Sequence, residues 1–323
     1  MNLRRLALLG KIAFTLALGA LLLRQVDLAE LGALVHALGR QHLLAAGALL
    51  VLQSALLAVR WQRLLVLLGQ HIPFGLAWRW LMVGLFFNQA LPTSVGGDAF
   101  RIWCLHRRGA APGIAFASVA IERSTGLVLL ACLIAACVPL LDRPLPTAVA
   151  LPLLAAGPLL ALVLGVVLLA EPLLQRWLPT AMQAALVTTC SGLRLLLRAP
   201  GEALVVTLLG LAAAMCGLGG AWVLGLGLGL DQPLQAVIVV LGGAMLVSLL
   251  PVSLGGWGVR EASVVVLFSA LGVAPERALA MSVAFGLLQL LVALPGGLLW
   301  WLDGHAAPTQ APTQAPALDA APR

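Results

Sequence analysis

Charged residues are scarce in this chain: they make up 10% of its 323 residues, while 62% are hydrophobic and the mean hydropathy is +1.06. Apolar runs of membrane-spanning length follow one another along the sequence, which leaves no room for a folded soluble domain between them. We therefore predict an all-α, multi-pass helical integral membrane protein with about seven to nine membrane segments.

The sequence also lacks clustered metal or redox ligands. Its five histidines are scattered, and its five cysteines lie singly in apolar surroundings, without metal-ligand or redox spacing. We expect no metal site, no cofactor and no catalytic residue. The cysteines are interpreted as small packing residues: Cys104, Cys132, Cys137, Cys190 and Cys216.

The formal net charge of +7 comes from basic residues spread over short loops, without a long basic run. In a membrane protein such residues mark cytoplasmic loops, so nucleic-acid binding is not indicated. Arg60, Arg63 and Arg79 come after an apolar run at 43–59, which predicts a cytoplasmic loop there.

The N-terminus consists of Arg4 and Arg5 followed by an apolar run over 6–23. This pattern could be a signal peptide, but it lacks a small-residue cleavage site before a polar region. We expect a retained first span with a cytoplasmic N-terminus, in agreement with the loop after 43–59.

A short pattern occurs twice. Residues 91–101 read LPTSVGGDAFR, and residues 250–260 read LPVSLGGWGVR. Each copy breaks an apolar helix, because proline removes a backbone donor and paired glycines loosen the next turn. Apolar helices broken at corresponding places in two halves are typical of a transporter site.

The flanking charges predict that the first copy enters from the inner face and the second from the outer face. That arrangement is an inverted repeat of two broken or re-entrant helix pairs, although two ordinary short spans remain an alternative for the first copy. We predict one transmembrane domain over 1–302, with motif copies at 88–101 and 250–261. A disordered Ala/Pro-rich tail is predicted at 303–323.

Two further segments interrupt the pattern of spans. The region 171–202 is more polar and has apolar positions at helical spacing, which predicts a cytoplasmic helix at the interface. The last span, about residues 278–302, is expected to be interrupted at Pro295, Gly296 and Gly297.

The motif itself suggests an anion site. A helix that begins after Gly97 or Gly256 presents unpaired N–H groups and a positive dipole end, and Arg101 and Arg260 come about one turn later. Together these groups could hold a phosphate-type anion. Alternatively, the nearby serines and the aspartate are helix caps and the arginines snorkel to an interface.

Glu122 and Arg123 stand together inside an apolar run, where each charge costs about 2.5–3.5 kcal/mol and therefore needs a partner. Glu122 could reach Arg101 or Arg260, and Arg123 could pair with Asp98 or Glu261. A purely structural ion-pair network is the alternative. The candidate substrate-binding residues are Asn88, Pro92, Ser94, Gly96, Gly97, Asp98, Arg101, Glu122, Arg123, Pro251, Ser253, Gly255, Gly256, Arg260 and Glu261. Among them, Asn88 could bond freed backbone groups or the ligand.

The segments NQALPTSVGGDAFR, IERSTGL and LPVSLGGWGVREAS resemble the flippase-like family typified by the membrane part of bacterial lysylphosphatidylglycerol synthases. The resemblance covers roughly residues 54–302 and implies a multi-pass inner-membrane protein that handles lipids. In full-length synthases a soluble domain transfers the amino acid. Because the sequence ends here in an Ala/Pro tail, we expect a stand-alone member without that domain. The implied partners are an anionic phospholipid, a hopanoid, a glycolipid or a polyprenyl lipid.

The leading hypothesis is a lipid translocator that holds an anionic headgroup at the two broken helices. No ATP-binding motif is present, so a gradient or a coupled reaction would supply energy, and Asp98, Glu122 or Glu261 could carry a coupled proton. The alternatives are an intramembrane enzyme acting on a lipid-linked phosphate or sugar, and an accessory subunit of a lipid-synthesis complex.

Overall fold

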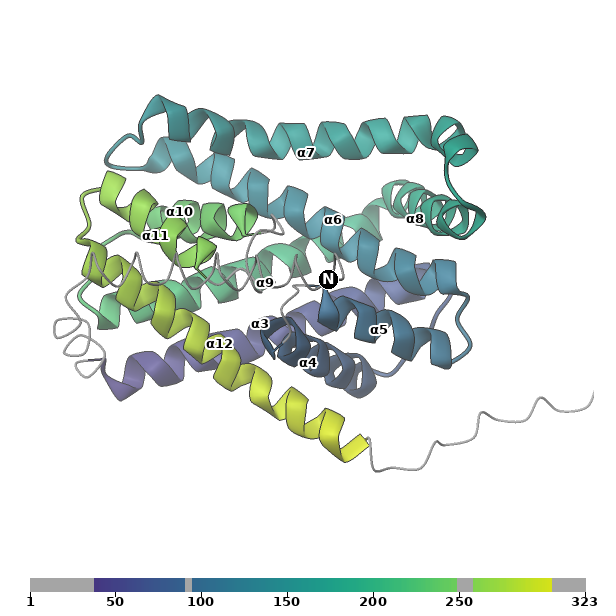
Figure 1. Cartoon of the computed structure of the whole chain (residues 1–323), viewed down its shortest axis with the longest axis horizontal. Helices are drawn as coiled ribbons and strands as arrows, with labels where there is room; N and C mark the ends of the chain where they lie inside the picture. Colours follow the sequence, from purple (N-terminus) through teal and green to yellow (C-terminus); the bar gives the residue numbers. More distant parts are fainter. Residues whose placement is uncertain (1–37, 91–94, 249–257, 304–323) are drawn as a thin grey trace, which may run out of the picture.

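The computed structural model describes residues 38–90, 95–248 and 258–303, and this part of the chain is helical with no strand (Figure 1). The predicted all-α, multi-pass class is confirmed. The expected span at 6–23 and almost all of the expected tail lie outside the described residues. The α-helices are α3 (Arg40–Leu67), α4 (Phe74–Ala90), α5 (Gly96–Arg107), α6 (Pro112–Cys137), α7 (Thr147–Leu174), α8 (Thr180–Arg198), α9 (Pro200–Gly227), α10 (Leu234–Val247), α11 (Val259–Ala270) and α12 (Pro275–Asp303); η1 (Val138–Leu140) and η2 (Gln175–Trp177) are single 3-10 turns.

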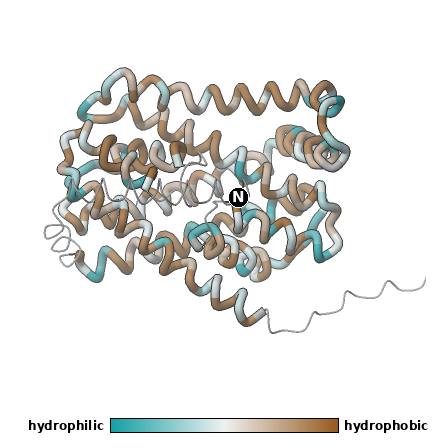
Figure 2. Tube along the Cα trace, viewed as in Figure 1, coloured by the Kyte–Doolittle hydropathy of each residue, from teal (hydrophilic) through white to brown (hydrophobic). Residues whose placement is uncertain are grey.

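Five of these helices are long and apolar enough to cross a membrane: α3, α6, α7, α9 and α12, the second and third counted with the 3-10 turns that extend them. Helix α7 carries large apolar side chains that are exposed, and Figure 2 shows it hydrophobic along most of its length. In water such a surface would be unfavourable, whereas lipid tails accept it. The exposed apolar residues of α7 include Leu151, Leu159, Leu162, Val166 and Leu169.

The order of helix lengths repeats. Helices α3, α4, α5 and α6 have 28, 17, 12 and 26 residues, and α9, α10, α11 and α12 have 28, 14, 12 and 29. Each unit is therefore a long helix, two short ones and another long helix, with the repeated sequence motif between the short pair. In the sequence, helices α7 and α8 connect the two units.

The turns that end the helices repeat as well. After α3 and α9 the chain turns at Gly69 and Gly229, whose φ angles are 74° and 70°. The N–H of the residue after each glycine bonds back five residues, to Leu65 and Gly225 respectively, which closes the helix in a Schellman motif. Glycine is required because other residues adopt a positive φ only at a cost. Gly109 and Gly272 end α5 and α11 in the same way.

The two units interlock. Helices α3 and α9 pack against each other, while α4 of the first unit packs against α12 of the second and α10 of the second packs against α6 of the first. In Figure 1, α3 and α9 run in opposite directions, as do α6 and α12. The helix pair α4–α5 lies toward one end of the bundle, on the right in Figure 1, and α10–α11 lies toward the other.

Packing of the loops supports the same arrangement. Ile72, before α4, and Ala110, after α5, belong to one buried cluster, so the first pair leaves and returns at the same end. The turns before α10 and after α11 line one cavity at the opposite end, through Gln232 and Gly272. The described structure therefore contains two similar helical hairpins that enter the bundle from opposite ends.

Two sequence-based expectations are wrong. Helix α3 continues to Leu67, so Arg60 and Arg63 belong to it and not to a loop, and Arg79 belongs to α4. Arg60 is buried and Arg63 is exposed. Helix α12 passes through Pro295 without interruption. Its Gly296 lies against α4 so closely that a Cβ there would overlap the carbonyl oxygen of Met82. The glycine serves close helix packing and does not break the helix.

Helix α8 corresponds to the amphipathic helix expected within 171–202. It buries Cys190, Leu193 and Leu196 against the bundle and exposes Leu195 and Leu197. An ion pair joins it to the end of α7, from Arg194 to the buried Glu171, and Arg194 also donates to the carbonyl oxygen of Leu168 at 2.6 Å. These contacts fix α8 across the end of the bundle to which α4–α5 belongs (Figure 1).

Candidate functional site

The hairpin α4–α5 is held together at its inner end by Asn88 and two glycines. The side-chain oxygen of Asn88 accepts a hydrogen bond from the N–H of Gly97 at 2.8 Å, so a protein group satisfies one free donor at the start of α5. Gly97 also packs directly on Gly84, since a Cβ on Gly97 would overlap the Gly84 carbonyl oxygen. Of the two roles considered for Asn88, the structure shows the bond to backbone.

An ion-pair network connects this hairpin to α6. Arg101 donates to Asp98 at 2.8 Å and to Glu122 at 2.5 Å. Arg123 donates to both oxygens of Asp98, at 2.7 and 3.0 Å. Of the pairings that the sequence left open, the structure thus shows Glu122 with Arg101 and Arg123 with Asp98.

The network is buried apart from one member. The side chains of Arg101, Asp98 and Glu122 are 4%, 11% and 6% exposed, whereas that of Arg123 is 49% exposed. Arg101 also lies over the ring of Trp61, with its guanidinium carbon 5.0 Å from the ring centre, a favourable cation–π distance. Buried charges of this kind persist only when paired and hydrogen-bonded, as they are here.

A cavity of about 270 Å³ opens beside the network. Its wall combines the charged side chains with apolar ones from α3, α4 and α6, so the cavity is amphipathic. We call it the hairpin cavity. Its lining consists of Leu57, Arg60, Leu81, Gly84, Leu85, Asn88, Gly97, Asp98, Arg101, Glu122, Arg123, Gly126, Leu127 and Leu130.

Arg60 is a member of this lining that the sequence analysis placed in a loop. It is 3% exposed, and it donates from Nε to the carbonyl oxygen of Val206 at 3.2 Å and from Nη2 to the hydroxyl of Thr125 at 2.8 Å. A signal was available, because apolar residues at helical spacing continue past Arg60 through Trp61, Leu64 and Leu65, all of which are buried.

The second hairpin carries a smaller polar group. Arg260 donates to Glu261 at 2.9 and 2.6 Å and to Gln289 of α12 at 3.3 Å. The other oxygen of Glu261 accepts from the N–H of Gly258 at 2.6 Å, which caps α11. Glu261 therefore stabilises the start of a helix and pairs with Arg260.

The predicted site residues fall into three groups. Asn88, Gly97, Asp98, Arg101, Glu122 and Arg123 line the hairpin cavity, with Gly96 at the first position of α5. Arg260 and Glu261 are not among the residues of that cavity, so the two motif arginines do not share it. The remaining candidates lie outside the described residues: Pro92, Ser94, Pro251, Ser253, Gly255 and Gly256.

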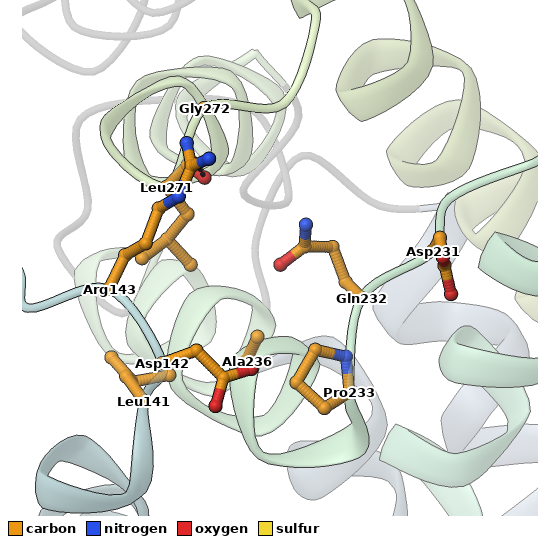
Figure 3. A pocket seen from close by; sticks show the side chains of 9 residues that line it. All are labelled: Leu141, Asp142, Arg143, Asp231, Gln232, Pro233, Ala236, Leu271 and Gly272. Atoms are coloured by element: carbon orange, nitrogen blue, oxygen red, sulfur yellow. Dashed lines mark hydrogen bonds between the residues drawn. The ribbon is translucent and has the colours of Figure 1, made fainter.

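A second cavity, of about 170 Å³, lies among the turns at the opposite end of the bundle (Figure 3). Arg143 extends along one side of it toward Leu271 and Gly272, and its Nη1 donates to the Leu271 carbonyl oxygen at 3.4 Å. Asp142 and Gln232 complete a polar rim. None of the residues around this cavity was a candidate from the sequence.

Comparison with known proteins identifies the family of this chain. The family model of the lysylphosphatidylglycerol synthase TM region matches residues 8–297. A UPF0104 membrane protein of Methanocaldococcus jannaschii is 33% identical over 85 residues, which cover 26% of this chain and 25% of that relative. The match to the family model runs through both hairpins and every long helix of the fold. The chain therefore belongs to the family of the lysylphosphatidylglycerol synthase TM region.

Proposed function

We propose that this protein is a lipid translocator that moves an anionic lipid or lipid-linked intermediate across the bacterial inner membrane. The observation that carries the proposal is the hairpin cavity, where charged groups gather inside an apolar bundle. Three guanidinium groups (Arg60, Arg101, Arg123) and two carboxylates (Asp98, Glu122) line it, so one positive charge is in excess. Charged side chains inside a membrane protein are costly and typically mark a substrate pathway.

The distribution of charge at the two ends of the helical bundle supports one orientation of the protein in the membrane. The end that holds α4–α5 has more arginines than carboxylates, although Glu171 and Glu202 also lie there, whereas arginines and carboxylates are balanced at the opposite end. By the positive-inside rule the first end is cytoplasmic. The arginines of the first end include Arg63, Arg107, Arg108, Arg176 and Arg198; the opposite end has Arg40, Asp142, Arg143, Asp231, Glu276 and Arg277.

On this orientation the two hairpins are re-entrant from opposite faces of the membrane. Each of α5 and α11 is about 18 Å long at 1.5 Å per residue, well short of a hydrocarbon core of about 30 Å. A headgroup in the hairpin cavity would then sit part-way across, with its tails in the surrounding bilayer. Alternating exposure of the two hairpins would release it to the other leaflet, as in other inverted-repeat transporters.

Leaflet exchange in proteoliposomes tests the proposal. The wild type is expected to accelerate the exchange of headgroup-labelled phosphatidylglycerol over protein-free vesicles, and Arg101→Lys to slow it about tenfold. Lysine keeps the charge but cannot hold Asp98 and Glu122 with a planar fork. Arg198→Gln is the control, because Arg198 is exposed at the end of α8 and does not line the cavity.

The alternatives make different predictions in the same experiment. An intramembrane enzyme would change the lipid chemically, which mass spectrometry of the recovered lipids detects. An accessory subunit would leave exchange at the protein-free rate with every anionic phospholipid, glycolipid and polyprenyl phosphate tested. Translocation as the function would be rejected by a chemical change of the lipid without accelerated exchange, or by exchange that stays at the protein-free rate with all of these lipids.

Cysteine accessibility tests the orientation of the hairpins. In a background without native cysteines, Arg108→Cys, after α5, is expected to react with an impermeant maleimide only from the cytoplasmic side. Asp231→Cys, before α10, is expected to react only from the outer side. Labelling of both positions from one side would contradict two hairpins that enter from opposite faces.

A further inference from the structure

We infer that Arg60 is the residue that binds the phosphate of the translocated headgroup. This inference deepens the proposed function and rests on it, because it assigns a ligand chemistry to one side of the hairpin cavity. The motif arginine Arg101, which the sequence favoured for this role, is already committed to the protein's own carboxylates.

The charge pattern of the cavity singles out Arg60. Arg101 is matched by Glu122 and Asp98, and Arg123 by two bonds to Asp98. Arg60 forms no hydrogen bond or ion pair with a carboxylate of the described residues, although Glu122 acts on it electrostatically from a greater distance. Its two hydrogen-bond acceptors, a backbone carbonyl and a hydroxyl, are neutral. The excess positive charge of the cavity therefore resides on Arg60.

The structure keeps room for this side chain. Gly126 of α6 and Gly210 of α9 flank it: a Cβ on Gly126 would lie 3.2 Å from Nη1, and one on Gly210 would lie 3.0 Å from Nε. A guanidinium has five N–H donors, and the two acceptors use two of them, which leaves about three for a ligand. Because Gly126 also lines the cavity, the Nη1 end of Arg60 stands at the cavity wall.

This chemistry favours a lipid phosphate. A guanidinium binds phosphate through two parallel N–H···O bonds, and one excess positive charge matches the single charge of a phosphodiester. The apolar side of the cavity suits the glycerol and acyl parts of the same molecule, whereas a free phosphate would leave that wall without a ligand group. This apolar side is formed by Leu57, Leu81, Leu85, Leu127 and Leu130.

The test is the affinity of the purified full chain for phosphatidylglycerol, measured by native mass spectrometry from detergent. Arg60→Gln is expected to weaken binding about 10- to 100-fold, the range of a lost charge-assisted pair. Arg60→Lys keeps the charge but loses the second parallel bond, so it is expected to bind less tightly than the wild type while retaining the preference for phosphatidylglycerol over diacylglycerol, which lacks the phosphate. Arg63→Gln is the matched control, three residues along α3, exposed and outside the cavity, and should bind like the wild type.

Thr125→Val separates a ligand role from a packing role. It removes the Arg60 side-chain acceptor without changing charge, so it should lower the melting temperature while the preference for phosphatidylglycerol persists. If Arg60→Gln fails to fold, lipid binding by Arg60→Lys decides whether Arg60 binds the ligand or only stabilises the packing. A folded Arg60→Lys variant without the preference overturns the inference, and one that keeps it supports the inference.

The remaining outcomes identify the ligand, and they show whether the assignment of Arg60 or the proposed translocation is wrong. Inorganic phosphate that displaces the lipid at equal concentration would identify free phosphate as the ligand and overturn the lipid assignment. A folded Arg60→Gln variant that binds phosphatidylglycerol like the wild type overturns the inference, even if exchange by the wild type upholds translocation. If the wild type neither binds nor exchanges any anionic lipid, both the assignment of Arg60 and the proposed translocation are rejected.

Discussion

Replacing Arg101 by glutamine is expected to destabilise the protein by about 3–5 kcal/mol, the usual cost of removing one partner from a buried ion pair. The substitution leaves the carboxylates of Asp98 and Glu122 in a buried site, where only Arg123 still pairs with Asp98. The cation–π contact with Trp61 is lost as well. Thermal unfolding in detergent, followed by tryptophan fluorescence, measures the loss.

A double-mutant cycle identifies the origin of this loss. If an uncompensated charge on Glu122 is the cause, Arg101→Gln combined with Glu122→Gln should recover part of the stability, with a coupling of about 1–3 kcal/mol. Two single effects that simply add would contradict a direct pair at 2.5 Å. Arg198→Gln, which changes an exposed arginine, should unfold like the wild type.

Gly97→Ala is the second substitution with a large expected effect. The new Cβ would overlap the Gly84 carbonyl oxygen, and because that atom is backbone, α5 must move away from α4. Overpacking of this kind costs about 1–3 kcal/mol and sometimes more. The shift would also strain the bond from the Gly97 N–H to Asn88, so both stability and lipid exchange should fall.

Two other glycines provide graded controls for this prediction. A Cβ on Gly84 would lie 3.1 Å from the Gly97 carbonyl oxygen, a milder conflict, and one on Gly165 of α7 would meet nothing within 4 Å. The expected order of melting temperatures is therefore Gly165→Ala highest, then Gly84→Ala, then Gly97→Ala. Alanine is the better helix former, so Gly165→Ala should be neutral or slightly stabilising. Equal melting temperatures for all three would show that the hairpin is not tightly packed.

Much of the fold could be predicted from the sequence because a membrane imposes strong local rules. Apolar length alone identified the long helices, since backbone groups in lipid must be satisfied within each helix. The repeated proline and glycine pattern identified the two places where helices are broken. The pairings of Glu122 and Arg123 could be narrowed to two partners each, because a charge in an apolar run needs a counter-charge.

Other predictions failed because the deciding contacts are between distant segments. Arg60 is expected in a loop when only its charge is considered, but it is buried because Gly126 and Gly210 leave space for it. Pro295 and the glycines after it suggest a broken helix, yet α12 continues because Gly296 allows it to pack against Met82 of α4.

Hydropathy and the positions of proline and glycine were enough to predict a helical membrane protein with a repeated broken-helix motif, because these properties act locally along the chain. The choice of which charges meet came from the packing of the helices. Packing placed Arg101 between Asp98 and Glu122 and kept Arg260 with its own partners on another hairpin. It also left Arg60 as the arginine of the hairpin cavity with no paired carboxylate among the described residues. Ion pairs depend on separations of a few ångströms, and helix packing sets those separations where residue spacing cannot.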